Sequence, residues 1–253
     1  MPATALRTVK RPALAVLCAA AALGLSACGP SGTSAAEETG PFTGLSGPQI
    51  ANKAIKATKK ADSLTLDMNV KTADGQMKAF MALDTKGQCA GTISMGTGTA
   101  EVIRSGKVAY LRFDEAFLRD QNKDGSKEET EAVLKMLKGR WLKTDVTDPE
   151  AKDSLEMCEL NTMLSEFETG ANSAERGEET TVNGKKALVL TEKDGDTTYR
   201  IYVATEGEPY LLKLDQKGGE EPGTMTFTDY GKPVPAKKPA AKEILDLDEL
   251  GEQ

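Results

Sequence analysis

The chain has 253 residues, of which 39% are hydrophobic and 28% are charged, so it is long enough for one domain with a sizeable core. A formal net charge of −7 and an aromatic content of 5% argue against a nucleic-acid partner, which needs cations for its phosphates and rings for stacking. The sequence has no histidine, which excludes a Ser-His-Asp triad, a Cys-His dyad and a histidine-ligated metal site. These counts favour a binding protein over an enzyme.

Residues 1–27 have the pattern of an export signal. Three cations precede an apolar run, residues 13–25, that is shorter than the roughly 20 apolar residues needed to cross a bilayer. The run ends in Leu25-Ser26-Ala27-Cys28, which resembles a bacterial lipobox. That resemblance implies cleavage before Cys28, a diacylglyceryl thioether on its sulfur, and anchoring at the extracytoplasmic face of the cell membrane. The alternative is an ordinary secretory signal in which Cys28 falls by chance.

The rest of the chain predicts a tether, one domain and a tail. Residues 28–45 are rich in Gly, Ser and Thr and lack an apolar period, which is typical of a flexible tether. Residues 46–232 show no repeat and no break in composition, so we expect a single domain. Residues 233–253 contain a Pro- and Lys-rich spacer and then a short acidic amphipathic piece. This tail could dock on the sheet, dock on a partner, or fray.

The sequence has four cysteines, and the lipobox resemblance implies that Cys18 leaves with the signal and that Cys28 carries the lipid, so two remain for the folded domain. Cys89 and Cys158 are an even pair in an oxidising compartment, which predicts a disulfide. A bridge of that span would stabilise the fold by about 4 kcal/mol in the chain-entropy model. The alternatives are two buried thiols or a redox pair.

The apolar periodicity predicts one helix followed mainly by strands. Pro48 marks the first turn of an amphipathic helix that ends near Ala61. Residues 64–83 then alternate between apolar and polar around the turn Asp74-Gly75, which is typical of a hairpin. The same rule predicts nine further strands, and two helical stretches interrupt them. The strands are expected around 90–95, 100–104, 108–113, 140–145, 179–182, 187–192, 197–204, 210–215 and 224–230, and the helical stretches at 115–139 and 149–167.

The fold class is therefore α+β, a strongly curved antiparallel sheet of about eleven strands, or half-barrel, with helices packed on its concave side. A sheet of this size is too large for a few short helices to fill completely. An apolar hollow between sheet and helices is the expected consequence.

The order of sequence elements resembles that of a known family. Five fragments carry the likeness after the lipobox and tether, and they are 54–63, 64–68, 106–111, 139–144 and 228–234. They are similar to the actinobacterial LppX/LprG-type lipoproteins, which share the LolA/LolB-like fold. The resemblance covers residues 45–235 and implies a half-barrel with helices across its mouth and a cavity for acyl chains. It brings no catalytic motif.

The alternation of the strands nominates residues that would line this cavity. They are Leu64, Leu66, Met68, Met81, Leu83, Ile93, Met95, Tyr110, Leu188, Leu190, Ile201, Met225 and Phe227. Several are methionines, whose flexible thioethers adapt to irregular apolar guests. The alternative for each of them is an ordinary packed core, although a concave apolar lining as a whole is where a ligand would bind.

One short motif matches a calcium loop. Asp120, Asn122 and Asp124 are followed by Gly125 and then Glu131, the spacing of an EF-hand, whose oxygens suit Ca²⁺. The motif has no partner hand, and Lys127 stands where an apolar residue is usual. The favoured alternative is a polar turn between two helices, with Ser126 capping the second.

The sequence thus predicts a membrane-anchored, non-enzymatic lipoprotein that holds a hydrophobic or lipid ligand in an apolar half-barrel cavity and acts as a lipid carrier or chaperone of the cell envelope. Its expected partners are the membrane, through the acyl anchor, and an apolar small molecule, with no nucleic acid; a membrane protein is a further expected partner. The alternative is the same scaffold with a packed core, acting as an interaction or sensor-accessory lipoprotein. No cofactor is expected apart from Ca²⁺ at the motif above.

Overall fold

The computed structural model describes residues 40–148, 155–165 and 171–246. All of them belong to a compact unit that runs from Glu38 to Gln253. The predicted export signal, Cys28 and most of the predicted tether lie outside the described residues, as do parts of the predicted helix at 149–167 and the end of the acidic tail.

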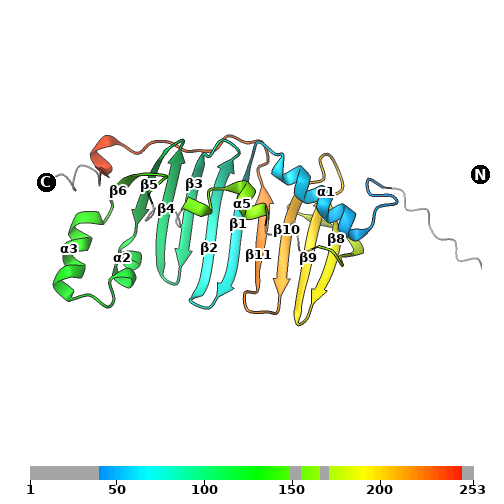
Figure 1. Ribbon diagram of the computed structural model, residues 1–253, viewed down its shortest axis with the longest axis horizontal. Helices are drawn as coiled ribbons and strands as arrows, with labels where there is room; N and C mark the ends of the chain where they lie inside the picture. The colour runs from blue at the N-terminus through cyan, green and yellow to red at the C-terminus, as the bar shows by residue number, and fades with distance from the viewer. Residues whose placement is uncertain (1–39, 149–154, 166–170, 247–253) are drawn as a thin grey trace, which may run out of the picture. The chain divides into compact units, whose positions relative to one another are not determined.

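Twelve strands form one curved, unclosed sheet in the order β12-β6-β5-β4-β3-β2-β1-β11-β10-β9-β8-β7 (Figure 1). The predicted α+β half-barrel is therefore confirmed. All neighbouring strands are antiparallel except the β12–β6 pair. The strands are β1 (Ser63–Thr72), β2 (Gly75–Asp84), β3 (Cys89–Met95), β4 (Gly98–Ser105), β5 (Val108–Phe113), β6 (Trp141–Asp145), β7 (Glu175–Val182), β8 (Lys185–Asp194), β9 (Thr197–Ala204), β10 (Leu211–Lys217), β11 (Gly223–Thr228) and β12 (Ile244–Asp246).

Two meanders meet in the middle of the sheet. Strands β1 to β6 follow one another outward, and β7 to β11 return from the opposite end, so that β11 pairs with β1. The Leu66–Phe227 pair lies at this junction, where it joins residues far apart in the chain. The two halves therefore share one continuous apolar face.

Glycine is required where the chain reverses or where elements approach closely. Asn183 and Gly184 join β7 to β8 with φ values of 49° and 80°, the left-handed conformation of a two-residue hairpin turn. At Gly98 a Cβ atom would lie 2.6 Å from the Cα of Phe117, so only glycine lets the following helix approach β4.

The first helix, α1 (Gly47–Lys59), begins with a capping box in which Ser46 and Gln49 satisfy each other's backbone amides, and Pro48 stands in its first turn. Its buried stripe includes Ile50, Ala54 and Ile55, which pack on the sheet over β9 and β10 (Figure 1). The predicted amphipathic helix is therefore confirmed.

The predicted helical stretch at 115–139 is two helices, α2 (Glu115–Gln121) and α3 (Lys127–Leu137), at the β4–β6 end of the sheet. A short helix, α5 (Leu160–Ser165), packs on the apolar face through Leu160 and Leu164. Within the described ranges, no helix has the length and apolarity that a membrane crossing requires.

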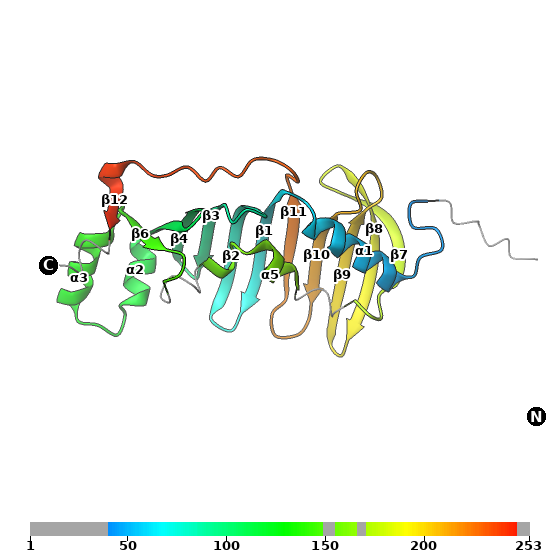
Figure 2. The same ribbon diagram turned by 45° about the horizontal axis from the view of Figure 1, so that its top comes forward.

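The tail docks on the sheet as far as residue 246. The amide of Gly231 donates to the carbonyl of Ser63 (2.9 Å), and the Ser63 hydroxyl donates to the carbonyl of Lys232 (2.6 Å). From there the tail runs along the sheet to β12 at its far end, as Figure 2 shows. The ammonium of Lys143 in β6 pairs with the carboxylate of Asp246 in β12 at 2.5 Å. The tail therefore adds β12 to the edge of β6. The sequence pattern did not predict this strand.

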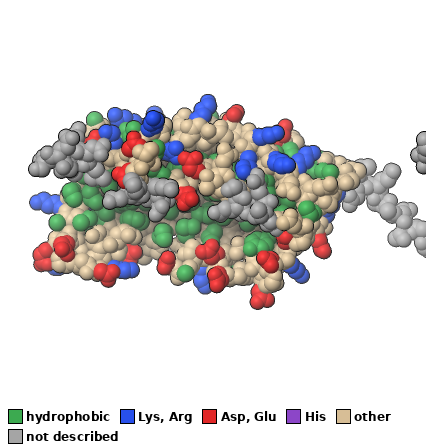
Figure 3. Space-filling model, in the orientation of Figure 1, with side chains coloured by type: hydrophobic (Ala, Val, Ile, Leu, Met, Phe, Trp, Pro, Cys, Tyr) green, Lys and Arg blue, Asp and Glu red, His purple; other side chains and the backbone are tan. Residues whose placement is uncertain are grey.

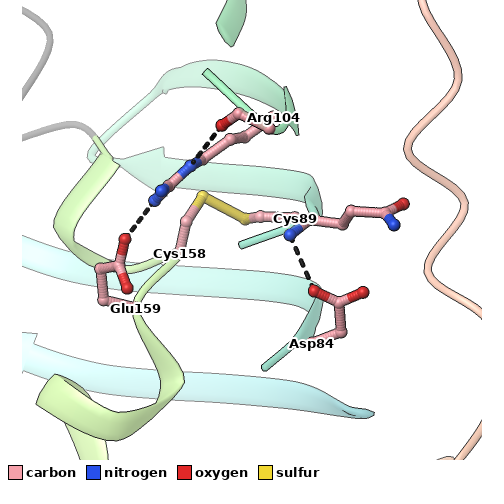
Figure 4. Close-up of a disulfide and its surroundings, with 7 residues drawn as sticks. Asp84, Cys89, Arg104, Cys158 and Glu159 are labelled. Carbon is pink, nitrogen blue, oxygen red and sulfur yellow. Dashed lines mark hydrogen bonds and ion pairs between the residues drawn. A yellow bond between two sulfur atoms is a disulfide. The ribbon is translucent and has the colours of Figure 1, made fainter. Parts of the chain in front are cut away.

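A disulfide fixes the α5 segment to the sheet. Cys89, the first residue of β3, is bonded to Cys158, just before α5, and their Cα atoms are 5.4 Å apart (Figure 4). Beside it, the guanidinium of Arg104 in β4 pairs with the carboxylate of Glu159. The disulfide predicted from the cysteine count is present, and it closes a loop of 69 residues.

Removing the disulfide is expected to destabilise the fold by about 4 kcal/mol, because a loop of this length restricts the unfolded chain strongly. The measurement is urea unfolding of residues 28–253 carrying Cys28→Ser, here named the acyl-free chain, with and without dithiothreitol. Every described helix and strand lies within this acyl-free chain.

The control is the acyl-free chain with Cys89→Ser and Cys158→Ser, whose unfolding midpoint should not respond to dithiothreitol. An unchanged midpoint of the unsubstituted acyl-free chain under reduction would contradict a stabilising bridge.

On the outer face of the sheet, Asp215 links three neighbouring strands. Its carboxylate accepts hydrogen bonds from the hydroxyl of Tyr202 (3.0 Å), the ammonium of Lys213 (2.9 Å) and the hydroxyl of Thr224 (2.9 Å). Burial alone would raise the pKa of Asp215, but the three donors outweigh it and hold this pKa below its ordinary value. The ionised carboxylate therefore stabilises the folded state.

Asp215→Asn is expected to lower the free energy of unfolding at pH 7. Because the pKa of Asp215 is lower in the folded state, its contribution is complete above the ordinary value of about 3.9 and is lost as the pH falls through the folded value. The gap in unfolding free energy between the unsubstituted protein and Asp215→Asn should thus narrow below about pH 4. Urea unfolding at pH 7 and pH 3 measures it, with the exposed Asp67→Asn as control; a gap that does not change with pH would contradict the assignment.

Candidate functional site

A cavity of about 420 Å³ lies between α1 and the strands β8 to β11. Ile55 comes from α1, and Ile201, Leu214 and Met225 come from β9, β10 and β11. Each strand residue faces the helix because cross-strand partners share a face, and Ile201 pairs with Leu214, which pairs with Met225. The complete lining is Ile55, Ala171, Ser173, Glu192, Lys193, Asp194, Tyr199, Ile201, Leu211, Leu214, Gln216 and Met225.

One end of the cavity is polar. Glu192, Tyr199 and Gln216 continue the cavity-facing rows of β8, β9 and β10 toward the strand ends. Glu192 is only 8% exposed, and its carboxylate accepts hydrogen bonds from the amide (3.2 Å) and hydroxyl (2.7 Å) of Ser173. The cavity thus combines an apolar wall with a polar end, which is the arrangement that an amphipathic guest requires.

The helix that roofs the cavity is fixed to the sheet at Leu211. The amide of Leu211 donates to the hydroxyl of Thr58 in α1 (2.9 Å), and its carbonyl accepts from the hydroxyl of Tyr230 (2.5 Å). Burial raises the pKa of Tyr230, so its phenol stays protonated and remains a donor. The Leu211–Thr58 bond, which is buried, therefore holds the roof in addition to its apolar contacts, and Tyr230 satisfies the carbonyl of the same residue of β10.

The apolar face extends beyond the cavity. In Figure 3, hydrophobic side chains form a recessed band along the face that α1 and α5 partly cover, with charged side chains on either side of it. Toward the β3–β6 end, Ile93, Phe113 and Leu142 pack against the core but are only partly buried. The helices in the described part of the chain therefore leave part of this face uncovered.

Apart from Tyr110, the predicted lining residues fall into three groups. Ile201 and Met225 line the cavity. Ile93 is partly buried, and Met95, on the predicted face, is 45% exposed at its rim. The rest of the set that shares this face is buried in the packed core, and it comprises Leu64, Leu66, Met68, Met81, Leu83, Leu188, Leu190 and Phe227.

The prediction for Tyr110 is wrong. Tyr110 pairs with Ile103, which pairs with Ala90, and this row faces away from α1 and α5. Its neighbour Leu111 lies on the cavity side and belongs to the core. Tyr110 is nevertheless only 5% exposed, because β5 is buried on both faces. The apolar character of Tyr110 therefore did not indicate on which face of the sheet its side chain lies.

Sequence reasoning missed most of the cavity lining. Leu211 and Leu214 are three residues apart, because an irregularity in the β9–β10 pairing breaks the period of two. The polar residues Glu192, Tyr199 and Gln216 each lie two residues from an apolar residue of the same face, namely Leu190, Ile201 and Leu214. The alternation along each strand could therefore have predicted that these polar residues face the cavity. Ile55 and Ser173 come from other elements, and only the fold brings them to the site.

The calcium motif lies in the turn between α2 and α3. The side-chain amide of Asn122 donates to the carbonyl of Leu118 (2.8 Å), and the carboxylate of Glu131 pairs with the guanidinium of Arg119 (3.1 Å). Ser126 caps α3 through a capping box with Glu129. Within the described ranges, no three His, Cys, Asp or Glu side chains form a group that could hold a metal ion, so Asp120, Asp124 and Glu131 do not. The structure favours the polar-turn interpretation.

No protein-family model matches the chain, and no curated protein matches its sequence. Among solved structures, the chain is similar to LprF from Mycobacterium bovis, with a TM-score of 0.52 and 12% identity over 77% of this chain and 97% of that one. It is also similar to the lipoprotein LppX from Mycobacterium tuberculosis, with a TM-score of 0.46 and 12% identity over 74% of this chain and 97% of that one. The likeness to LprF shows that the two chains share a fold. The LolA-like fold implied by the resemblance to LppX/LprG-type lipoproteins is thereby confirmed.

Filling the cavity should weaken the binding of an apolar probe. Met225→Trp places an indole toward Ile201 and Leu214, whereas Thr226→Trp, one residue on, places the same side chain on the opposite face. Nile red fluorescence titrations of the acyl-free chain should show at least about tenfold weaker binding for Met225→Trp and little change for Thr226→Trp. Equal losses, or none, in the two variants would contradict the cavity as the binding site.

Proposed function

We propose that this protein is a membrane-anchored lipoprotein that binds an acyl chain or another apolar ligand between α1 and the sheet, and that it carries such ligands in the cell envelope without chemical conversion. The observation that carries the proposal is the cavity of about 420 Å³ with an apolar wall and one polar end. Its volume falls in the range of roughly 300–1,000 Å³ typical of small-molecule sites.

The binding energy would come from the apolar wall. Burial of an acyl chain is worth about 0.8 kcal/mol per methylene, so about ten methylenes would supply about 8 kcal/mol before the cost of ordering the chain. The polar end at Glu192 and Gln216 would face the head of an amphipathic ligand. No energy source is encoded, so the direction of transfer would be set by partners.

The membrane anchor and the extracytoplasmic location rest on residues outside the described part. The n-region, the apolar run and the lipobox at Cys28 support acylation. The Cys89–Cys158 disulfide supports an oxidising compartment. These features support the proposal that the carrier is anchored at the extracytoplasmic face of the cell membrane.

The alternative function is an interaction or sensor-accessory module on the same scaffold. It would need no ligand cavity, and the packed centre of the sheet around Leu66 and Met81 is compatible with it. The cavity beneath α1 favours the carrier function, since an interaction module does not require an internal cavity with a polar end.

Native mass spectrometry of the protein purified from its own membranes tests the proposal. The expected result is a bound lipid in addition to the acyl groups on Cys28, lost from Met225→Trp and retained by Thr226→Trp. A protein that carries no lipid from its membranes and binds no apolar probe would contradict the carrier function and leave the interaction module.

A further inference from the structure

The outer face of α1 carries a row of lysines. Lys53, Lys56 and Lys60 are exposed, and their spacing of three and four residues places them on one side of the helix and its C-cap. We call these three residues the lysine face. They border a surface groove of about 650 Å³, whose lining also includes Gln49, Asn52, Ala57, Glu208 and Pro209.

The charge of this groove is opposite to that of the chain. Glu208 is the one carboxylate among the lining residues, against the three lysines, whereas the whole chain carries −7. Basic side chains gather along the upper side of α1 in Figure 3. Lys53 is exposed, although its ammonium also lies 5.9 Å from the ring centroid of Phe42. The groove therefore suits a surface of negative charge.

The position of α1 in the chain indicates which negative surface it would meet. Gly40, the first described residue, lies twelve positions beyond Cys28, with eleven residues between them. Even fully extended, twelve residues span at most about 40 Å. With Cys28 acylated, as proposed above, α1, the first helix among the described residues, stays within reach of the lipid headgroups.

We infer that the lysine face docks on a bilayer that contains anionic phospholipids, so that the outer side of α1 lies against the headgroups. The inference rests on the proposed anchor for its cellular setting, but the binding itself does not depend on the acyl chains.

Docking in this orientation has a consequence for the cavity. Ile55 lines the cavity and its neighbour Lys56 lines the outer groove, so α1 separates the two by its own thickness. A membrane-bound lysine face would hold the roof of the cavity at the lipid surface, where an acyl chain enters or leaves. The tether alone would leave the orientation of the domain undetermined.

Vesicle flotation tests the inference with the acyl-free chain, which separates docking from acylation. Vesicles of phosphatidylcholine alone are compared with vesicles that contain 30% phosphatidylglycerol, at low and at high salt. One lysine near an anionic surface strengthens binding about fivefold, so replacing all three by glutamine should weaken it about a hundredfold. Binding should be absent from phosphatidylcholine vesicles and should fall steeply with salt.

Two matched variants control for folding and for total charge. Replacement of Lys53, Lys56 and Lys60 by arginine keeps the charge and should keep the binding. Replacement of the exposed Lys78, Lys123 and Lys135 by glutamine removes the same charge elsewhere and should leave binding nearly unchanged. Urea unfolding verifies that each variant is folded.

The inference is overturned if the unsubstituted acyl-free chain does not bind anionic vesicles, if it binds both vesicle types equally, or if the two glutamine variants lose binding equally. Met225→Trp should bind vesicles as the unsubstituted chain does. Loss of docking with intact Nile red binding would thus refute only the membrane orientation, whereas loss of Nile red binding with intact docking would refute only the ligand cavity.

Discussion

The constraint on which the rest of the structure depends is the need to cover one long apolar face. Two meanders join at β1 and β11 into a single sheet, so apolar side chains form a continuous surface from Leu142 in β6 to Leu190 in β8. Apolar surface left in water is unfavourable, and the short helices α1 and α5 are what the described chain offers to cover it. They cover the centre of the sheet, and a hollow remains between α1 and the strands β8 to β11.

The hollow persists because its covers are fixed independently of any filling. Thr58 holds α1 to Leu211 by a buried hydrogen bond, and the hydroxyl of Ser173, which also lines the cavity, donates to the carboxylate of Glu192 in β8. The guanidinium of Arg176 donates to the carbonyls of Phe42 (2.9 Å) and Leu45 (3.3 Å), which fixes the segment that leads into α1. Because α1 is fixed at these points, it resists the inward relaxation toward the sheet by which a cavity usually closes. The same rigid helix presents lysines to the outside, so ligand binding and membrane docking are proposed for its two sides.

Local patterns predicted the strands well because the period of two is a backbone property, and β1 to β11 lie where the alternation placed them. The pattern failed where burial is two-sided: β5 buries Ala109, Tyr110 and Leu111 in succession, so its alternation cannot fix which side faces the helices. The position of the cavity was also beyond the sequence, since it depends on where α1 lies on strands more than a hundred residues away. The segment from Asp120 to Glu131 illustrates a pattern that predicted too much. A helix cap and a calcium loop use the same residue types, so the sequence alone could not distinguish them.

The central claim is that an acyl chain occupies the space between α1 and the sheet, and methyl NMR tests it most directly. With ¹³C-methyl methionine in the acyl-free chain and an unlabelled, fully protonated fatty acid as probe, the account predicts that ¹³C-edited spectra show intermolecular nuclear Overhauser effects from the fatty acid to the methyl group of Met225. It predicts none to Met136, which is 48% exposed on α3 and serves as the internal control. Contacts to Met136 alone, or to neither methyl group at saturating probe, would contradict the account.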